Sequence, residues 1–427
     1  MSFDPACNST AHLVSRRSML GNMLAGAAGV GAVGHLIQPA VAKEIESKKK
    51  QVLIFLLNGG LSQFESFDPK PNTDTGGPFR AIPTSVPGTH FCELMPHTAQ
   101  VAHKLAVVRS MFAEKVPGSH GGARDYVVTG RPPQQGPYPW MAPVYSKLLG
   151  DSGDLPGNIH IAPSRWGPRP DAAFLGPKHA SLVLSGGRPP LNVDRPELFD
   201  KKLDDTRYKL REIADLRFSQ RRRTAHTEAY QSSYDQAQQL IRQKELFDIT
   251  QESEKDQQRY GSHDMGRHCL LARRLLERGV TCVKVTHNNY DSHMENFNFH
   301  LEQLGEFDKP FATLMNDLDQ RGMLDHTLVM LITEFGRTPE IRPDNGRDHW
   351  PPNWSVVVGG CGIQVGGVLG ATNENGTEIT DRPVHVAEMF HTYMRAVGLD
   401  PTETHLVGGN RVPIGAPERE AVKELLI

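Results

Sequence analysis

Three apolar segments of this sequence are each followed by a loop that carries carboxylates, imidazoles or guanidinium groups. The segments span residues 52–58, 280–285 and 327–333. The side chains in the loops are Ser62, Glu65 and Asp68 after the first, His287, Asp291 and His293 after the second, and Glu334, Arg337, Asp348 and His349 after the third. Carboxylates mixed with imidazoles favour divalent cations such as zinc, manganese or magnesium. A bound cation would polarise a phosphoryl or sulfuryl oxygen, or lower the pKa of a water molecule.

The same groups would also form a polar network that holds the three loops together without a metal. In that interpretation Asp348 orients His349, and Arg337 pairs with Glu334. Because such side chains recur at three predicted strand ends, we favour one shared metal site over separate networks.

The segment "GSHGGARDYVVTGR", residues 118–131, has a glycine-rich turn before a predicted helix. Glycine allows close approach of a backbone, and a helix N-terminus favours an anion. His120 and Arg124 stand where an anion would be held, and Ser119 is a candidate nucleophile. A glycine-rich turn before a helix is common, so the segment alone does not define a site.

Strand and helix patterns alternate along the chain and predict the elements that position these groups. Continuous apolar runs, typical of strands buried on both faces, occupy residues 52–58, 105–111, 280–285, 327–333 and 354–360. Amphipathic helices are predicted at 94–103, 264–278, 297–321 and 384–398. The pattern predicts an α/β fold, a doubly wound, mainly parallel sheet flanked by helices. In such sheets functional residues gather beyond the carboxyl ends of the strands.

Residues 196–260 differ in composition from the rest. They are dense in Gln, Arg, Lys, Asp and Glu, and contain no Pro or Gly between Glu197 and Arg259. We predict long helices inserted into the α/β core, and we interpret the basic run Arg221–Arg223 as a solvated helix face. Whether the insertion caps the site or mediates assembly stays open.

Residues 1–42 have the pattern of a twin-arginine export signal. Arg16 and Arg17 precede a weakly apolar run, residues 20–37, and Ala40-Val41-Ala42 offers an A-x-A cleavage site. An uncleaved membrane anchor is the alternative, but the run is rich in glycine and interrupted by His35. We therefore expect the twin-arginine translocation machinery as a partner, cleavage before Lys43, and a periplasmic or secreted protein with no stable membrane span.

Net charge and cysteine spacing argue against two further classes of protein. A formal net charge of -2 argues against a nucleic-acid surface, which usually needs a basic stripe. Four cysteines remain beyond the export signal, without C-x-x-C spacing, which argues against a zinc knuckle. They are Cys92, Cys269, Cys282 and Cys361. Disulfides and buried free thiols both remain open for them.

Several longer motifs, together with the export signal, resemble a large bacterial family, domain-of-unknown-function family 1501. That family is similar to the alkaline phosphatase and sulfatase superfamily. The motifs are "GGLSQFESFDPKP", "TGRPP", "RGMLDHTLVMLITEFGRTP", "GRDHW" and "GGCGIQVGGVLGAT". The resemblance covers nearly the whole mature chain and implies a single alkaline phosphatase-like domain, residues 43–427, with the helical insertion at about 196–260.

The resemblance also implies roles for single residues. Arg124 falls on the sulfatase motif arginine and His120 on the nucleophile position, where no cysteine is present for conversion to formylglycine. Asn58 matches the aspartate after the first strand and is a neutral oxygen donor. Glu334 and Phe335 match a later Asp-His pair, so one ligand is lost there.

Two functions remain open at this point. The first is a metal-dependent hydrolase of phosphate or sulfate esters, with Arg124 and Arg337 on the anion, a metal-bound water or Ser119 attacking, and His120 as a further catalytic candidate. Its candidate metal ligands are Asn58, Asp291, His293, Glu334, Asp348 and His349. The metal would be zinc, manganese, calcium or magnesium, with no nucleotide cofactor. The second is a non-catalytic exported protein of the same fold that binds an anionic saccharide or a cell-surface partner. In either case we expect a small anionic ester or a sulfated or phosphorylated saccharide as ligand.

Overall fold

The structure is a computed structural model that describes residues 49–427 except 117, 152–154, 164–170, 189–199 and 220–224. Residues Lys50–Ile427 form one compact unit. The expected export signal, residues 1–42, lies outside the described residues. Among the helices that are described, none combines the length and the apolar character needed to cross a bilayer.

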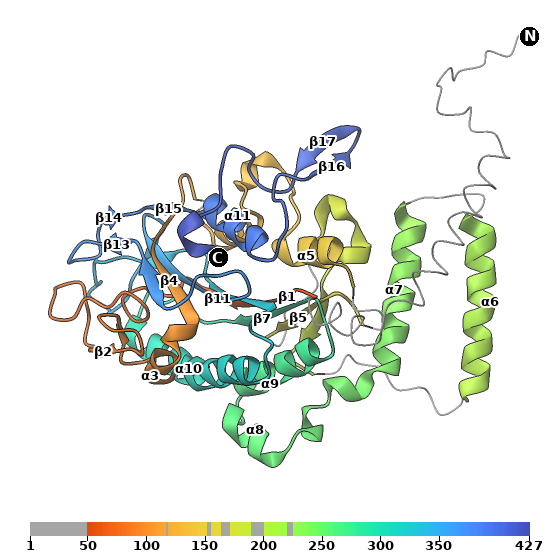
Figure 1. The fold of residues 1–427 in the computed structure, drawn as a ribbon, viewed down its shortest axis with the longest axis horizontal. Coiled ribbons are helices and arrows are strands. Elements are labelled where there is room, and N and C mark those ends of the chain that lie inside the picture. The colour runs from red at the N-terminus through yellow and green to blue at the C-terminus, as the bar shows by residue number, and fades with distance from the viewer. Residues whose placement is uncertain (1–48, 117, 152–154, 164–170, 189–199, 220–224) are drawn as a thin grey trace, which may run out of the picture. The chain divides into compact units, whose positions relative to one another are not determined.

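A nine-stranded sheet lies at the centre of the fold (Figure 1). Its strands are β1 (Gln51–Leu57), β4 (Leu105–Phe112), β5 (Asn158–Ala162), β6 (Leu182–Ser185), β7 (Cys282–His287), β8 (Thr327–Ile332), β11 (Trp354–Gly360), β12 (Gly367–Leu369) and β15 (Val384–His385). The order is β12-β4-β11-β8-β1-β7-β5-β6, with β15 also paired to β4. β11 runs antiparallel to β4 and β8, and the other pairs are parallel. The predicted α/β fold with a mainly parallel sheet is confirmed.

The central strands are apolar at consecutive positions because both faces of the sheet are covered. All seven residues of β1 are buried. Leu53 and Phe55 belong to one hydrophobic core, whereas Ile54 and Leu56 belong to the other. Each such side chain contributes about 1.5–3 kcal/mol when removed from water, which explains an apolar run without alternation.

Helices cover each face of the sheet. Those that contribute to the core with Leu53 are α3 (Pro96–Gln100), α9 (Asp264–Glu277) and α10 (Asn296–Gln320). Those on the opposite core are α4 (His120–Thr129), α5 (Met141–Leu149) and α11 (Val386–Ala396). Figure 1 shows α9 and α10 below the sheet and α5 and α11 above it. The helix predicted at 94–103 is shorter than expected, because α3 ends at Gln100 and a single 3-10 turn, Ala102–Lys104, follows.

Four short antiparallel strand pairs are separate from the central sheet in the described chain. They are β2 (Ala81–Pro83) with β3 (His90–Cys92), β9 (Gly336–Arg337) with β10 (His349–Trp350), β13 (Ala371–Thr372) with β14 (Ile379–Asp381), and β16 (Thr404–Val407) with β17 (Asn410–Pro413). The β9–β10 hairpin matters for the site, because it sets His349 opposite Arg337.

The region 196–260 contains the helices α6 (Lys201–Ser219), α7 (Ala225–Arg242) and α8 (Glu254–Tyr260). α8 is fixed to the core through the buried carboxylate of Asp317 on α10. This carboxylate accepts hydrogen bonds from Arg259, from Tyr260 at 2.9 Å and from Arg273 at 2.8 Å. α7 reaches the core through the buried Leu240.

The four cysteines of the described chain are buried free thiols. Burial raises the pKa of Cys92 to about 12, and burial also raises the pKa of Cys269 and of Cys282. A protonated, buried thiol is a poor nucleophile, so of the two alternatives that the sequence left open the structure shows free thiols that act as core residues.

Three adjacent parallel strands bring their carboxyl ends to one edge of the sheet. β8, β1 and β7 are neighbours, with Ile332 level with Leu56 and His287 level with Leu57. β4 points the same way, because two antiparallel pairings separate it from β8. The loops after all four strands therefore reach the same edge.

Two buried histidines make the stability of the fold depend on pH. Burial lowers the pKa of His268 and of His300 to about 4, whereas an unfolded histidine titrates near ~6.5. The unfolded state therefore binds more protons between these values, and stability falls as the pH drops through this window. We expect a loss on the order of 3 kcal/mol for each histidine between about pH 7.5 and pH 4, measured by urea unfolding.

His300→Gln removes one titrating group and should flatten this dependence. The exposed His90 provides the matched control, and His90→Gln should leave the slope unchanged. A slope equal to that of the parent in the His300 variant would contradict the assignment.

Candidate metal centre

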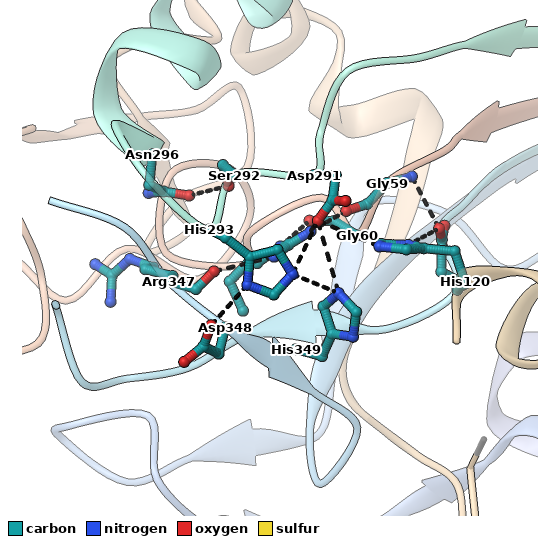
Figure 2. Close-up of polar contacts among 12 residues, drawn as sticks. Gly59, Gly60, His120, Asp291, Ser292, His293, Asn296, Arg347, Asp348 and His349 are labelled. Carbon is teal, nitrogen blue, oxygen red and sulfur yellow. Dashed lines mark hydrogen bonds and ion pairs between the residues drawn. The ribbon is translucent and has the colours of Figure 1, made fainter. Parts of the chain in front are cut away.

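Four side chains converge beyond the carboxyl ends of the strands. One ligand atom from each of His120, Asp291, His293 and His349 lies within 4.8 Å of all the others. Figure 2 shows the three imidazoles arranged around the carboxylate of Asp291. Nε2 of His120 and Nε2 of His293 are each 3.2 Å from Asp291 Oδ1, and Nε2 of His349 is 3.6 Å from it.

Each of the three imidazoles has a hydrogen-bond partner at Nδ1, the ring nitrogen other than the Nε2 that lies near Asp291. The partners are a carboxylate in two cases and a backbone carbonyl in the third. The pairs are His120 with Glu334 Oε1 at 2.8 Å, His293 with Asp348 Oδ1 at 2.6 Å, and His349 with the carbonyl of Gly118 at 3.2 Å. An acceptor behind Nδ1 fixes the tautomer with hydrogen on Nδ1 and leaves a lone pair on Nε2. All three Nε2 lone pairs then face the same point.

This arrangement fits a bound cation. Nε2 of His293 and Nε2 of His349 lie only 3.0 Å apart, and with both lone pairs directed inward neither donates a hydrogen. Nε2 of His120 is buried, makes no hydrogen bond within the described part of the chain, and lies 3.2 Å from Asp291 Oδ1. A buried nitrogen lone pair that faces a carboxylate oxygen without a donor between them costs free energy, and a metal ion bound to both atoms would remove that cost.

Burial and neighbouring charges shift the pKa values of the residues in the centre. Burial lowers the pKa of His349, and the charge of Arg337 lowers it further. Burial also opposes protonation of His120, but Glu334 and Asp291 outweigh it and raise the pKa of His120. The pKa of Asp291 is lowered, because Arg337 and His120 outweigh its burial. An ionised carboxylate thus faces imidazoles that differ in how readily they accept a proton.

Three nitrogens and one carboxylate oxygen define the type of metal. Calcium and magnesium prefer sites made of oxygen atoms. Zinc binds imidazole nitrogen and carboxylate oxygen in four-coordinate sites, and manganese and iron accept the same donors. Of the metals considered from the sequence, this donor set favours zinc or manganese.

Arg337 links the loops that carry the ligands. Its guanidinium is fully buried and donates to Asp291 Oδ1 at 2.9 Å, to the carbonyl of Gly60 at 3.0 Å and to the carbonyl of Arg347 at 3.0 Å. It also donates to the carbonyl of Gly59. The sequence interpretation placed Arg337 on an anion or on Glu334, whereas the structure places it on Asp291 and shields it from solvent.

Backbone strain and close approach shape the ligand loops. Asn289, Glu295 and Asn345 have left-handed backbones, with φ of 74°, 52° and 57°, which costs energy in residues other than glycine. Gly59 has φ of 121°, and a Cβ there would lie 2.5 Å from the amide nitrogen of Asp291. Only glycine therefore lets the β1 and β7 loops approach this closely.

The other residues singled out near the helix α4 lie beside the centre and have different contacts. Asn58 Oδ1 accepts a hydrogen bond from Arg124 at 3.2 Å, and Arg124 also packs over the ring of Trp140. Ser119 is exposed and caps α4, with its Oγ accepting from the amide of Gly122 at 3.4 Å. Asn58, Arg124 and Ser119 are thus not part of the four-residue cluster.

The remaining strand-end residues belong to the supporting network. Glu65 is buried against Arg347 at 3.0 Å, and Asp68 accepts from Lys70 at 3.0 Å. His287 contacts the hydroxyl of Tyr290 at 2.9 Å. Ser62 is buried and donates its amide hydrogen to Nε2 of His300. Of these four positions of the first two loops, none is a member of the cluster in the described residues.

Comparison with known proteins assigns the family. Residues 49–426 match the sequence profile described as "Protein of unknown function (DUF1501)". The chain belongs to the DUF1501 family. The resemblance seen in the motifs is therefore confirmed, and no curated protein matches the sequence.

Solved structures similar to this DUF1501 protein come from the alkaline phosphatase and sulfatase superfamily. The PsFucS1 sulfatase from Pseudoalteromonas sp. is 13% identical, with 84% of this chain and 67% of that chain covered and a TM-score of 0.37. An alkaline phosphatase superfamily protein from Vibrio parahaemolyticus is 11% identical, with 82% and 67% covered and a TM-score of 0.36. The C-terminal periplasmic domain of EcEptC from Escherichia coli, solved with Zn, is 9% identical, with 90% and 93% covered and a TM-score of 0.39. These values are too low to support an argument about activity.

Two residues of the DUF1501 site lie in other surroundings than the sequence interpretation gave them. His120 was placed at the nucleophile position, yet the structure groups it with the metal-ligand candidates. Phe335, matched to a histidine ligand by the resemblance, packs 5.0 Å from the ring of His120 and 4.3 Å from that of His349. Two signals in the sequence pointed toward His120, the glycine-rich turn after the strand at 105–111 and the match to the sulfatase motif.

The carboxylates behind the imidazoles should control metal affinity in this DUF1501 protein. Glu334→Gln and Asp348→Asn keep the shape of the side chain but weaken the acceptor behind Nδ1 of His120 and His293. We expect each variant to bind zinc about 10–100-fold more weakly than the parent, measured by competition with a chromophoric chelator. Glu302→Gln, an exposed carboxylate on α10, is the control. Affinities equal to that of the control would show that the two carboxylates do not support the ligands.

Proposed function

We propose that this protein is a metal-dependent hydrolase of phosphate or sulfate esters. The observation that carries the proposal is the convergence of three Nε2 lone pairs and Asp291 Oδ1, each imidazole being fixed through Nδ1. In our assignment His120, Asp291, His293 and His349 hold the metal. A divalent ion held there would supply Lewis acidity to an ester oxygen and lower the pKa of a nearby water.

Exposure of the centre favours catalysis over a purely structural metal. The side chains of Asp291 and His293 are 48% and 41% exposed, so an ester can reach the ligand atoms from solvent. With four protein ligands, catalysis also requires that the metal keep an open position for water or substrate on this exposed side, as in five-coordinate zinc. The exposure favours the hydrolase over a non-catalytic binding protein with an enclosed structural metal.

The surroundings suit an anionic substrate. α4 begins at His120, so the positive end of its dipole lies at the centre, where it favours negative charge. The positive charge of the buried Arg337, which contacts Asp291, adds to the positive electrostatic potential at the centre. Because Arg337 is enclosed, we assign it a positioning role on Asp291 and not a contact with substrate.

The chain's own residues hold protons at defined atoms during the reaction. Glu334 and Asp348 keep hydrogen on Nδ1 of His120 and His293, so the Nε2 atoms stay available as donors of lone pairs. Phe335 covers one side of the His120 and His349 rings and excludes water there. The nucleophile in this proposal is a water, and the exposed Ser119 next to His120 is the alternative.

The place of action and the substrate class are also part of the proposal. The Arg16-Arg17 pair and the A-x-A pattern ending at Ala42 support twin-arginine export to the periplasm or beyond. A sulfated or phosphorylated saccharide is the substrate class we propose for a centre open to solvent on one side.

Metal content and turnover of the mature chain, residues 43–427, test the proposal together. We expect about one zinc or manganese ion per chain, and hydrolysis of aryl phosphate or aryl sulfate esters that chelation abolishes and added metal restores. Asp291→Ala combined with His349→Ala should remove the metal and lower hydrolysis at least ~100-fold. Ser119→Ala should keep most of the activity if water is the nucleophile.

Two results would contradict the proposal in different ways. If the parent protein holds no metal after purification in zinc and without chelator, the four residues do not form a metal centre. One equivalent of metal with no turnover of any phosphate or sulfate ester would leave the centre and favour the binding protein.

A further inference from the structure

The helix α6 carries apolar side chains on its exposed side. Leu203, Leu210, Ile213 and Leu216 recur at spacings of seven, three and three residues, which places them along one side of a helix. Together with Phe218 they are 45% to 62% exposed. Of the thirteen large hydrophobic side chains exposed in the described chain, seven lie on α6 and α7. Apolar surface is thus concentrated on this one pair of helices.

The side of α6 that faces α7 is polar instead. Arg211 contacts Asp235 of α7 at 3.1 Å and lies over the ring of Tyr234 at 4.4 Å. Asp215 contacts Arg211 at 3.4 Å, with both side chains mostly buried. Figure 1 draws α6 on the far side of α7 from the sheet. The usual arrangement, with apolar residues inside and charges outside, is therefore reversed in α6.

Basic residues accompany the apolar side. Lys202, Arg207, Lys209 and Arg217 are exposed and, at 3.6 residues per turn, project on or beside the side that carries Leu210. The carboxylates Asp205 and Glu212 project opposite to Leu203, at the edge of the apolar side next to Leu216. Residues 201–242 contain ten Lys or Arg and six Asp or Glu, in a chain whose net charge is -2.

From this combination we propose that α6 is a membrane-surface helix that binds an anionic lipid bilayer. The side formed by Leu203, Leu210, Ile213 and Leu216 enters the boundary between headgroups and acyl chains. The long side chains of Lys202, Arg207, Lys209 and Arg217 extend toward the negative headgroups. A second copy of the chain would bury the leucines but would bring these like charges together, which disfavours it as the occupant.

This surface is separate from the metal centre and does not depend on the proposed hydrolase activity. α7 connects it to the core through Leu240 and through a hydrogen bond from Gln236 to the carbonyl of Lys178. Bilayer binding would hold the open metal centre near substrates at a cell surface.

Sedimentation with lipid vesicles tests the proposal on the mature chain. The protein should bind vesicles of phosphatidylglycerol and not those of phosphatidylcholine, with or without metal, and binding should weaken as salt is raised. Leu210→Ser with Ile213→Ser, and separately Lys202→Gln with Lys209→Gln, should each lower the bound fraction at least ~tenfold.

Matched substitutions on another helix provide the control. Leu301→Ser and Lys309→Gln change exposed residues of α10 and should leave vesicle binding unchanged, and circular dichroism should show that all variants are folded. A parent protein that ignores anionic vesicles, or α6 variants that bind as the parent does, would overturn the proposal. So would a dimer in light scattering that Leu210→Ser with Ile213→Ser dissociates, because a second copy would then cover this side of α6.

Discussion

The buried guanidinium of Arg337 is the contact on which the arrangement of the site depends. It donates hydrogen bonds to the carbonyls of Gly59, Gly60 and Arg347 and to the carboxylate of Asp291. These groups belong to the loops after β1 and β7 and to the segment that leads to His349. A lysine could not make these contacts, because they use the planar, forked geometry of arginine. The cation also keeps Asp291 ionised, and so prepares the carboxylate for a metal.

Arg337 joins the loops, and a second set of contacts sets the orientation of each imidazole ring. Glu334 and Asp348 each hold one Nδ1, and the carbonyl of Gly118 holds the third. The same loops contain strained, left-handed backbones at Glu295 and Asn345. The folded chain therefore holds the four ligands in position before a metal binds. The free-energy cost of the strain and of the buried Nε2 atom is offset by the stability of the rest of the fold.

Much of the fold follows from local sequence pattern, because apolar runs and helical periodicity are local properties. The same reasoning brings Asp291 and His349 together, since their loops follow parallel strands. His120 could not be placed in this way. It follows β4, and only the order β4-β11-β8 shows that this loop reaches the same edge.

Other roles depend on atomic geometry that spacing does not encode. Asp348 contacts His293 and not its neighbour His349, although the two residues are adjacent in the sequence. Glu334 and Asp348 stand behind the imidazoles at distances that the sequence does not reveal. The reversed polarity of α6 likewise appears only when its contacts with α7 are known.

X-ray absorption spectroscopy of the zinc-loaded protein tests the central claim most directly. The account predicts a first shell of nitrogen and oxygen only, at about 2.0–2.1 Å, with outer-shell scattering from about three imidazoles that falls to two in His120→Ala. A shell of oxygen atoms without imidazole scattering, or an unchanged spectrum in that variant, would contradict a centre built from His120, Asp291, His293 and His349.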